Sequence, residues 1–391
     1  MSSAAVYLDH AATTPVAAEV LEVMLPHLAA HHGNPSSVHA SGRVARAAVD
    51  EARERVAAAL GCRAAEVVFT SGGSEADNLA LRGVVDRSGG GHVVVSAIEH
   101  DAVLHTAEQL AEQGRITLTV VGCDGRGVVD PLAVAAAVTP ETVLVSVMLA
   151  NNEVGTIQDV AAIAAAVRAR NPGTLVHTDA VQALGKLEVD VVALGVDLCT
   201  VTAHKAYGPK GAGALVVRRG VALAAQVSGG GQERARRAGT ENVAAIAGFG
   251  AACSLVIAER EREQMRLAAL SEHLIETVVS GVPDVVVTGA GGPRLASFAT
   301  FAFPGLITEV LLVRLDQLGV EASGGSACSS GASMPSHVLA AMGLPAHTAG
   351  GALRLTLGRG TTEAGVERAG AAVIDAVQGA RAILGVGAAT A

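Results

Sequence analysis

The feature that most constrains the fold of this chain is a regular alternation of strand-like and helix-like segments between residues 66 and 217. Apolar runs predict strands near residues 66–70, 92–96, 116–121, 142–148, 174–178, 197–202 and 213–217. Segments between them predict helices near residues 101–113, 130–138 and 159–170. Such alternation predicts an α/β fold whose large, mostly parallel sheet is covered by helices on both faces.

Further helices and strands are predicted on either side of this region. Two helices are expected before it, over residues 16–30 and 38–60. After residue 243 the pattern changes to a long helix that ends near residue 280. It is followed by strands near 284–288, 297–303 and 351–357 and helices near 307–318, 335–342 and 362–384. We therefore expect a large domain over residues 16–255 and a smaller α+β domain over residues 256–391. Residues 1–15 should pack with the small domain.

Charge and cysteine content narrow the functional classes. The net charge of −9 argues against nucleic-acid binding as the main function. Five cysteines without a CxxC pair fit a reducing cytoplasm better than a disulfide framework or a zinc site, and we expect no metal. No signal peptide is visible, and the apolar run over residues 242–258 is short for a membrane span. We therefore expect a cytoplasmic protein with no membrane partner.

Lys205 is the first candidate catalytic residue. The strand near residues 197–202 delivers it into a turn rich in glycine and proline, and Asp179 ends an earlier strand. A lysine at the edge of a core can lose its proton and attack a carbonyl. A carboxylate can pair with the protonated ring nitrogen of pyridoxal 5'-phosphate, so the two residues suggest the two ends of this cofactor. The alternative is a surface lysine in a polar turn.

Polar groups also follow other predicted strands. Residues 70–75 form a strand, a Gly-Gly turn and a helix start, and that start can bind an anion with the help of Ser74. His100, Asn152 and Gln182 each come just after a strand, where ligands bind in open parallel sheets. An ordinary helix cap or turn would explain any one of them. Their repetition favours a single convergent site.

Two residues of the expected small domain complete the set. Cys328 lies in a Gly/Ser-rich segment, which favours an exposed, reactive thiol on a mobile loop, whereas Cys199 and Cys253 lie in apolar elements and suit a core. Arg354 lies in an apolar strand and needs an anionic partner; its planar fork fits a carboxylate. The alternative for Arg354 is an internal salt bridge.

Together these motifs resemble the cysteine desulfurases, which belong to the class V group of fold-type-I pyridoxal phosphate enzymes. The match covers nearly the whole chain. The motifs occur in family order at residues 7–15 (YLDHAATTP), 33–37 (GNPSS), 70–75 (TSGGSE), 99–100 (EH), 151–155 (NNEVG), 177–182 (HTDAVQ), 204–205 (HK), 229–234 (GGGQER), 237–240 (RAGT), 326–328 (SAC) and 354–359 (RLTLGR).

The resemblance implies roles around the cofactor ring. Lys205 resembles the Schiff-base lysine, and Asp179 resembles the partner of the ring nitrogen. His100 is similar to the histidine that stacks on the ring, while Asn152 and Gln182 are similar to the residues that contact the ring oxygen. All five should therefore meet at one cavity.

The resemblance also implies a homodimer with its active site near the dimer interface. Gly73, Ser74, Thr202 and His204 match the residues that hold the cofactor phosphate. Thr240 matches a phosphate contact lent by the neighbouring subunit.

The remaining roles concern the substrate, L-cysteine. Asn34 and Arg354 resemble the pair that holds its carboxylate, and Cys328 resembles the nucleophile that accepts its sulfur as a persulfide while L-alanine leaves. The loop reads SGGSAC, where relatives commonly have SSGSAC. The C-terminus lacks the longer tail with which housekeeping members often dock an iron–sulfur scaffold.

The sulfur-acceptor protein therefore stays open at this point. It could serve iron–sulfur assembly, tRNA thiolation, DNA phosphorothioation or another sulfur biosynthesis. The alternative functions are a selenocysteine lyase or a class V aminotransferase, although the latter needs no thiol such as Cys328. A non-enzymatic sulfur-relay partner is a further alternative, against which the intact set of site residues argues.

Overall fold

The central element is a seven-stranded sheet, seen in a computed structural model that describes residues 5–325 and 336–385. The strand order is β2-β8-β7-β6-β5-β3-β4. The strands are β2 (Val67–Thr70), β3 (Gly91–Ser96), β4 (Ile116–Val121), β5 (Thr142–Ser146), β6 (Leu175–Asp179), β7 (Leu198–Thr202) and β8 (Gly213–Val217). Only the pairings of β8 are antiparallel. The predicted mostly parallel sheet is confirmed, and the carboxyl ends of β2, β3, β5, β6 and β7 share one edge.

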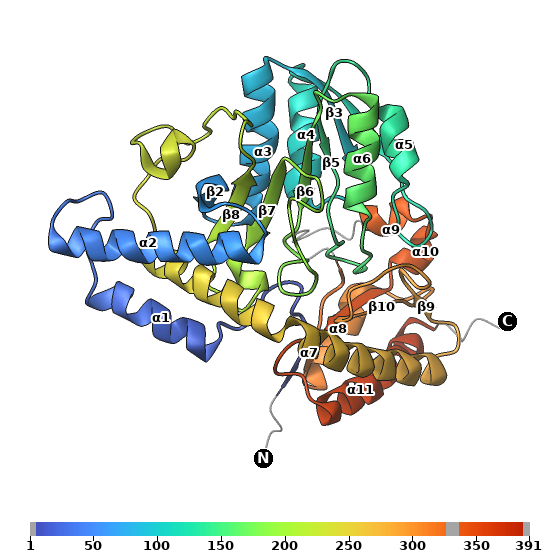
Figure 1. The fold of residues 1–391 in the computed structure, drawn as a ribbon. Coiled ribbons are helices and arrows are strands. Elements are labelled where there is room, and N and C mark those ends of the chain that lie inside the picture. The colour runs from blue at the N-terminus through green and yellow to red at the C-terminus, as the bar shows by residue number, and fades with distance from the viewer. Residues whose placement is uncertain (1–4, 326–335, 386–391) are drawn as a thin grey trace.

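Helices cover both faces of this sheet (Figure 1). One face packs Val93 and Val95 of β3 against α3 (Gly73–Ser88) and α4 (Asp101–Glu112). The other face packs Val94 and residues of the neighbouring strands against α2 (Ala40–Ala59), α5 (Pro131–Ala137), α6 (Val160–Arg170) and the start of α7. Successive residues of a strand point to opposite faces, which explains why these strands are apolar throughout.

The long helix α7 (Val243–Gly281) crosses the molecule beneath the sheet (Figure 1). Its N-cap is Asn242, whose side chain accepts a hydrogen bond from the amide of Ala245 at 3.3 Å. It packs on α1 (Ala18–Ala29), α2 and α11 (Glu363–Leu384). Its apolar part is long enough to span a membrane, but 67% of that window is buried in the protein, as expected for a core helix.

The second half of α7 lies against a smaller group of elements (Figure 1). A three-stranded antiparallel sheet, β12-β10-β9, packs its apolar side chains against α7, α8 and α11. The N-terminal β1 pairs in parallel with β11 of this group. The bounds are β1 (Val6–Tyr7), β9 (Val286–Val287), β10 (Phe298–Ala302), α8 (Thr308–Gln317), β11 (Val320–Glu321), α9 (His337–Ala341), α10 (Ala346–Ala349), β12 (Ala352–Thr356) and α11 (Glu363–Leu384). The division at residue 255 stays a prediction, since α7 continues through that point.

The segment between β8 and α7 contains a left-handed turn. Glu233, Arg234 and Ala235 have φ values of 45°, 57° and 58°. Residues with a side chain rarely adopt such values, so the surroundings must hold them there. The buried carboxylate of Glu233 does so: it accepts two hydrogen bonds from the guanidinium of Arg53, at 2.6 and 2.7 Å, and one from the amide of Phe69 at 2.9 Å.

Candidate active site

A cavity of about 270 Å³ lies at the carboxyl edge of the large sheet. Ten of the predicted site residues line it: Gly73, Ser74, His100, Asn152, Asp179, Gln182, Thr202, His204, Lys205 and Arg354. They come from five different strand ends and from β12, so the fold gathers residues that are far apart in the chain. A larger cavity of about 620 Å³ lies between the N-terminal segment and the start of α11, and none of the predicted residues lines it.

Lys205 ends a short 3₁₀ turn, η2 (Ala203–Lys205), that directly follows β7. Its amine donates to the backbone carbonyls of Ala11 and Ala12, at 2.5 and 2.7 Å. These two alanines also line the cavity. The N-terminal segment therefore forms one wall of the site and holds the lysine amine at its edge.

Asp179 ends β6 at the floor of the cavity and is 5% exposed. Its Oδ1 accepts a hydrogen bond from the amide of Val181 at 2.8 Å. Burial raises the pKa of the Asp179 carboxyl, and the nearby charges of His100 and Lys205 oppose that rise. A carboxylate in this position would be stabilised by a cation that binds in the cavity.

Two more buried carboxyls lie near Asp179. Asp77 of α3 lines the cavity, and its Oδ1 has no hydrogen-bond partner among the described residues. Burial and the charge of Asp179 raise the pKa of Asp77 well above its ordinary value. Burial also raises the pKa of Glu99 to about 8. The charges of His100 and Lys205 oppose the rise at Asp179, so a positive charge in the cavity favours ionisation of that carboxyl.

The turn after β2 has the form of an anion site. The backbone of Gly72 touches the start of β8 so closely that a Cβ on Gly213 would lie 2.7 Å from the Gly72 carbonyl carbon. Helix α3 begins at Gly73, and its first turn faces the cavity with Ser74. Free amides at the start of a helix of this length attract anions.

The hydroxyl of Thr202 and the imidazole of His204 line the same cavity. Thr202 donates to the carbonyl of Ala212 at 3.1 Å and can still accept. The Nδ1 of His204 lies 3.2 Å from the hydroxyl of Thr13. Burial, followed by the charges of Lys205 and other lysines, lowers the pKa of His204 to about 4. His204 is therefore neutral at physiological pH and can offer one N–H to an anion.

His100 forms the N-cap of α4. Its Nδ1 accepts a hydrogen bond from the amide of Ala102 at 3.0 Å, which fixes the ring at the cavity wall. Gln182 is 2% exposed, and its Nε2 donates to the carbonyl of Ala11 at 2.9 Å. Asn152 lines the cavity, and its carbonyl accepts from Arg354 at 2.6 Å.

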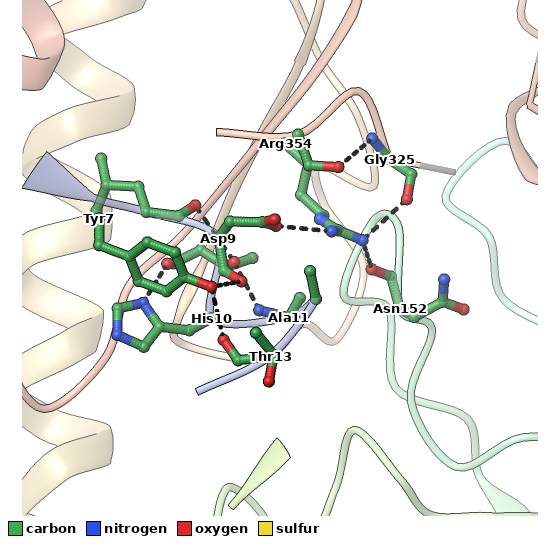
Figure 2. Close-up of polar contacts among 12 residues, drawn as sticks. Tyr7, Asp9, His10, Ala11, Thr13, Asn152, Gly325 and Arg354 are labelled. Carbon is green, nitrogen blue, oxygen red and sulfur yellow. Dashed lines mark hydrogen bonds and ion pairs between the residues drawn. The ribbon is translucent and has the colours of Figure 1, made fainter. Parts of the chain in front are cut away.

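Arg354 lies in the middle of β12 and is 2% exposed. Figure 2 shows its polar contacts. Its Nη1 donates to the carbonyls of Asn152 and Gly325, at 2.6 and 2.9 Å, and its Nη2 donates to Asp9 Oδ1 at 2.9 Å. Its Nε is buried without a hydrogen-bond partner in the described part of the chain. The internal salt bridge considered as an alternative thus exists, but it leaves one donor of the fork unused.

Three predicted site residues are not among those that line the cavity. Asn34 is exposed, and its side chain accepts from the amide of Ser36 at 2.9 Å. Thr240 is exposed at the end of the loop before α7. Cys328 lies outside the described residues. The roles given to these three stay predictions.

Four other features were missed by sequence reasoning. These are the carbonyls of Ala11 and Ala12, the partner Asp9, the half-buried Lys186, and Glu153, which accepts from Ser336 at 2.5 Å. Three of them depend on contacts between distant segments, for which the chain carries no local signal. The contact of Lys186 is local, because Lys186 follows Gln182 by four residues, and it could have been found in the sequence.

Pyridoxal phosphate fits the residues present. The cavity joins a helix N-terminus with neutral donors at one end to a buried carboxylate, Asp179, on its floor. A phosphate suits the first, and a protonated ring nitrogen suits the second. The amine of Lys205 lines the same cavity. No single ion would satisfy all three features.

Comparison with known proteins agrees with this chemistry. Residues 6–369 match the family model described as "Aminotransferase class-V". A cysteine desulfurase, IscS, of Dictyoglomus turgidum is 44% identical over 360 residues, which cover 92% of this chain and 91% of the relative. A solved NifS-like protein has a TM-score of 0.89 at 34% identity and covers 96% of this chain and 99% of its own. SspA, solved in complex with cysteine, has a TM-score of 0.80 at 33% identity, with coverages of 90% and 98%.

Proposed function

This chain belongs to the class-V aminotransferase family and is a cysteine desulfurase, and we propose that Lys205, Asp179 and Arg354 carry its reaction on L-cysteine. The observation that supports this assignment is the meeting of an amine, a buried carboxylate and a buried guanidinium in one cavity. The cysteine bound to SspA supports the choice of substrate.

The family depends on pyridoxal phosphate, and in this chain we assign its binding to the cavity. When bound, the cofactor supplies the electron sink that lets a proton leave the substrate Cα. The N-terminus of α3, with Ser74, Thr202 and His204, would hold the phosphate, and Asp179 would pair with the ring nitrogen. His100 would cover one face of the ring, as its fixed place on the cavity wall suggests.

Lys205 moves the Cα proton in this proposal, because its amine lines the cavity and is held there by the carbonyls of Ala11 and Ala12. Arg354 holds the substrate carboxylate. Its Nε donor has no partner among the described residues, and a carboxylate would satisfy it. Since Asp9 already occupies Nη2, the substrate would share or displace that contact.

The sulfur transfer belongs to Cys328. Its thiolate would attack the substrate sulfur, so that an S–S bond forms while the C–S bond breaks and its electron pair passes to carbon, which is protonated to give L-alanine. Burial raises the pKa of Cys62 to about 12 and raises those of Cys123, Cys199 and Cys253. These four are therefore poor thiolates, which favours Cys328 as the nucleophile.

We also propose a cytoplasmic homodimer that passes sulfur to an acceptor protein. Leu21, Leu25 and Leu28 on α1 are 44%, 53% and 63% exposed, and a second copy of the chain would cover them. Thr240 would then reach the partner's phosphate site. Iron–sulfur assembly, tRNA thiolation, DNA phosphorothioation and another sulfur biosynthesis are the candidate destinations of the sulfur.

The direct test of the cofactor assignment is chemical labelling of the lysine. Protein reconstituted with pyridoxal phosphate should be yellow, and borohydride should fix the cofactor to Lys205, as peptide mapping would show. Lys205→Ala should remove both the colour and the label. A label on Lys186 or Lys210 instead would refute the assignment.

A further inference from the structure

Lysine is rare in this chain, and its placement is unusual. Of the 28 lysines and arginines, three are lysines, and all lie between residues 186 and 210. Arginine stays charged in proteins, whereas a buried lysine can lose its proton near neutral pH. Lys205 has its role in the proposed function and Lys210 is exposed, so Lys186 is the lysine without an assigned task.

Lys186 lies one turn after Gln182 and folds back onto it. Its amine donates to the backbone carbonyl of Gln182 at 3.0 Å and to the side-chain Oε1 of Gln182 at 3.1 Å. Among the described residues no carboxylate forms an ion pair with this amine. The side chain is thus committed to one residue of the active-site wall.

The contacts of Gln182 determine which way its amide points. Oε1 accepts from Lys186, and Nε2 donates to the carbonyl of Ala11, which can only accept. Both neighbours therefore require the same orientation of the Gln182 amide. One N–H of the amide remains for an acceptor in the cavity that Gln182 lines.

Gln182 and Lys205 share one hydrogen-bond acceptor. The carbonyl of Ala11 accepts from Lys205 at 2.5 Å as well as from Gln182 at 2.9 Å. Burial, and then the charges of Lys205 and Arg354, lower the pKa of Lys186 to about 7. Charge repulsion is mutual, so a proton on Lys186 also disfavours one on Lys205.

We propose that Lys186 is a positioning residue for the catalytic lysine: its amine holds the Gln182 amide with N–H toward the cofactor cavity and places a second positive charge beside Lys205. The inference rests on the proposed role of Lys205. It deepens that role, because a donor at the ring oxygen and a nearby cation both favour the unprotonated form of the lysine–cofactor linkage.

Other charged groups near Lys186 do not replace the positive charge that it places beside Lys205. Lys186 borders a small cavity together with the titratable or charged residues His10, Lys205, Tyr207, Glu259, Glu263 and Arg359. The two glutamates already form ion pairs with arginines: Glu259 with Arg359 at 2.8 Å and Glu263 with Arg266 at 2.8 Å. The cations that act on Lys186 most strongly are Lys205 and Arg354.

The test is a spectroscopic pH titration of the protein reconstituted with pyridoxal phosphate. The visible band of the lysine-bound cofactor changes with pH, and its midpoint reports the protonation of the linkage. Lys186→Met should raise this midpoint by on the order of one pH unit, since a neighbouring positive charge and an oriented donor are lost. Lys186→Arg should keep the midpoint near the wild-type value, because it keeps a cationic donor.

Lys210→Met is the matched control, because it removes a lysine whose side chain is exposed and whose charge is screened; its midpoint should stay near the wild-type value. Gln182→Leu should raise the midpoint as Lys186→Met does, and it provides the test if Lys186→Met fails to fold. In the double variant, Lys186→Met should raise the midpoint of Gln182→Leu by less than it raises the midpoint of the wild type.

Two results would overturn the inference in different ways. An unchanged midpoint in folded, cofactor-bound Lys186→Met, or in Gln182→Leu if the first variant does not fold, would refute the role of Lys186 while leaving the proposed function intact. A wild-type protein that shows no pH-dependent band, or keeps its band in Lys205→Ala, would instead refute the proposed function, and the inference with it.

Discussion

Burial of charged groups dominates the chemistry of individual residues in this protein. Asp179 and Arg354 are at most 5% exposed and both line the cavity, and Arg354 Nε has no hydrogen-bond partner among the described residues. Sequence reasoning found both, because a charge at a strand end or inside an apolar strand stands out locally. It missed Asp9 as the partner of Arg354, since 345 residues separate the two.

Arg354 gives the first prediction at this scale. Arg354→Ala should weaken cysteine binding by on the order of 1.5–3 kcal/mol, because a charge-assisted contact to the carboxylate is lost. The cofactor should stay bound, as its visible band would show. Titration with cysteine measures the change, and Arg126→Ala, which removes an exposed ion pair with Asp124, is the control. Unchanged affinity in a folded Arg354→Ala protein would disprove the anchor role.

Glu99 gives a prediction about pH. Burial raises its pKa from an ordinary value of 4.5 to about 8, so the folded protein holds a proton there that the unfolded chain releases. The free energy of unfolding therefore falls as pH rises from about 4.5 to about 8. Glu99→Gln cannot ionise, so this fall should be shallower.

Urea unfolding of both proteins at the two ends of that range measures the effect. Asp77 and Asp179 also have raised pKa values, so a part of the pH dependence should persist in Glu99→Gln. Equal slopes for the wild type and the variant would contradict a proton on Glu99.

At the scale of elements, periodicity and apolar runs predicted all seven strands of the large sheet, because each has a strong local pattern. They did not indicate that β8 runs antiparallel, since direction depends on which neighbour a strand pairs with. Nor did they indicate the two-residue β11, which is too short to carry a pattern. The left-handed turn at Glu233 was also invisible, as its stability comes from Arg53, 180 residues away.

The Glu233 turn gives the prediction at this scale. Glu233→Ala should destabilise the protein by about 3–5 kcal/mol, because it leaves the guanidinium of Arg53 buried without its partner. Glu51→Ala removes an exposed ion pair from Arg55 on the same helix, α2, and should cost about 0.5 kcal/mol or less. Denaturant unfolding would compare them. Similar losses for the two variants would show that the turn does not depend on this pair.

At the scale of the whole molecule, one chain brings together most of the site but not all of it. Asn34 and Thr240 lie at the surface, away from the cavity. The apolar face of α1 is also exposed. Both facts favour the homodimer that the resemblance implies, because a second copy would bury the leucines and supply Thr240. A single sequence contains no direct signal for such an arrangement.

The predicted homodimer can be tested by measuring the mass of the protein in solution. Light scattering should give twice the mass of the 38.9 kDa chain. Leu25→Glu should shift the protein toward the monomer, because it places a charge on the proposed interface, while Leu132→Glu on the exposed face of α5 should not. A wild-type protein that stays monomeric at micromolar concentration would contradict the prediction.

The central claim is that this protein removes sulfur from L-cysteine and leaves it on Cys328. The most direct measurement is to incubate the wild type and Cys328→Ser with L-cysteine, assay L-alanine, and map alkylated persulfides by mass spectrometry. Cys328→Ser should keep the cofactor band yet give almost no alanine and no persulfide, because serine is a poor nucleophile toward sulfur. Alanine release at the wild-type rate from Cys328→Ser, or a persulfide mapped first to Cys62 or Cys123, would contradict the account.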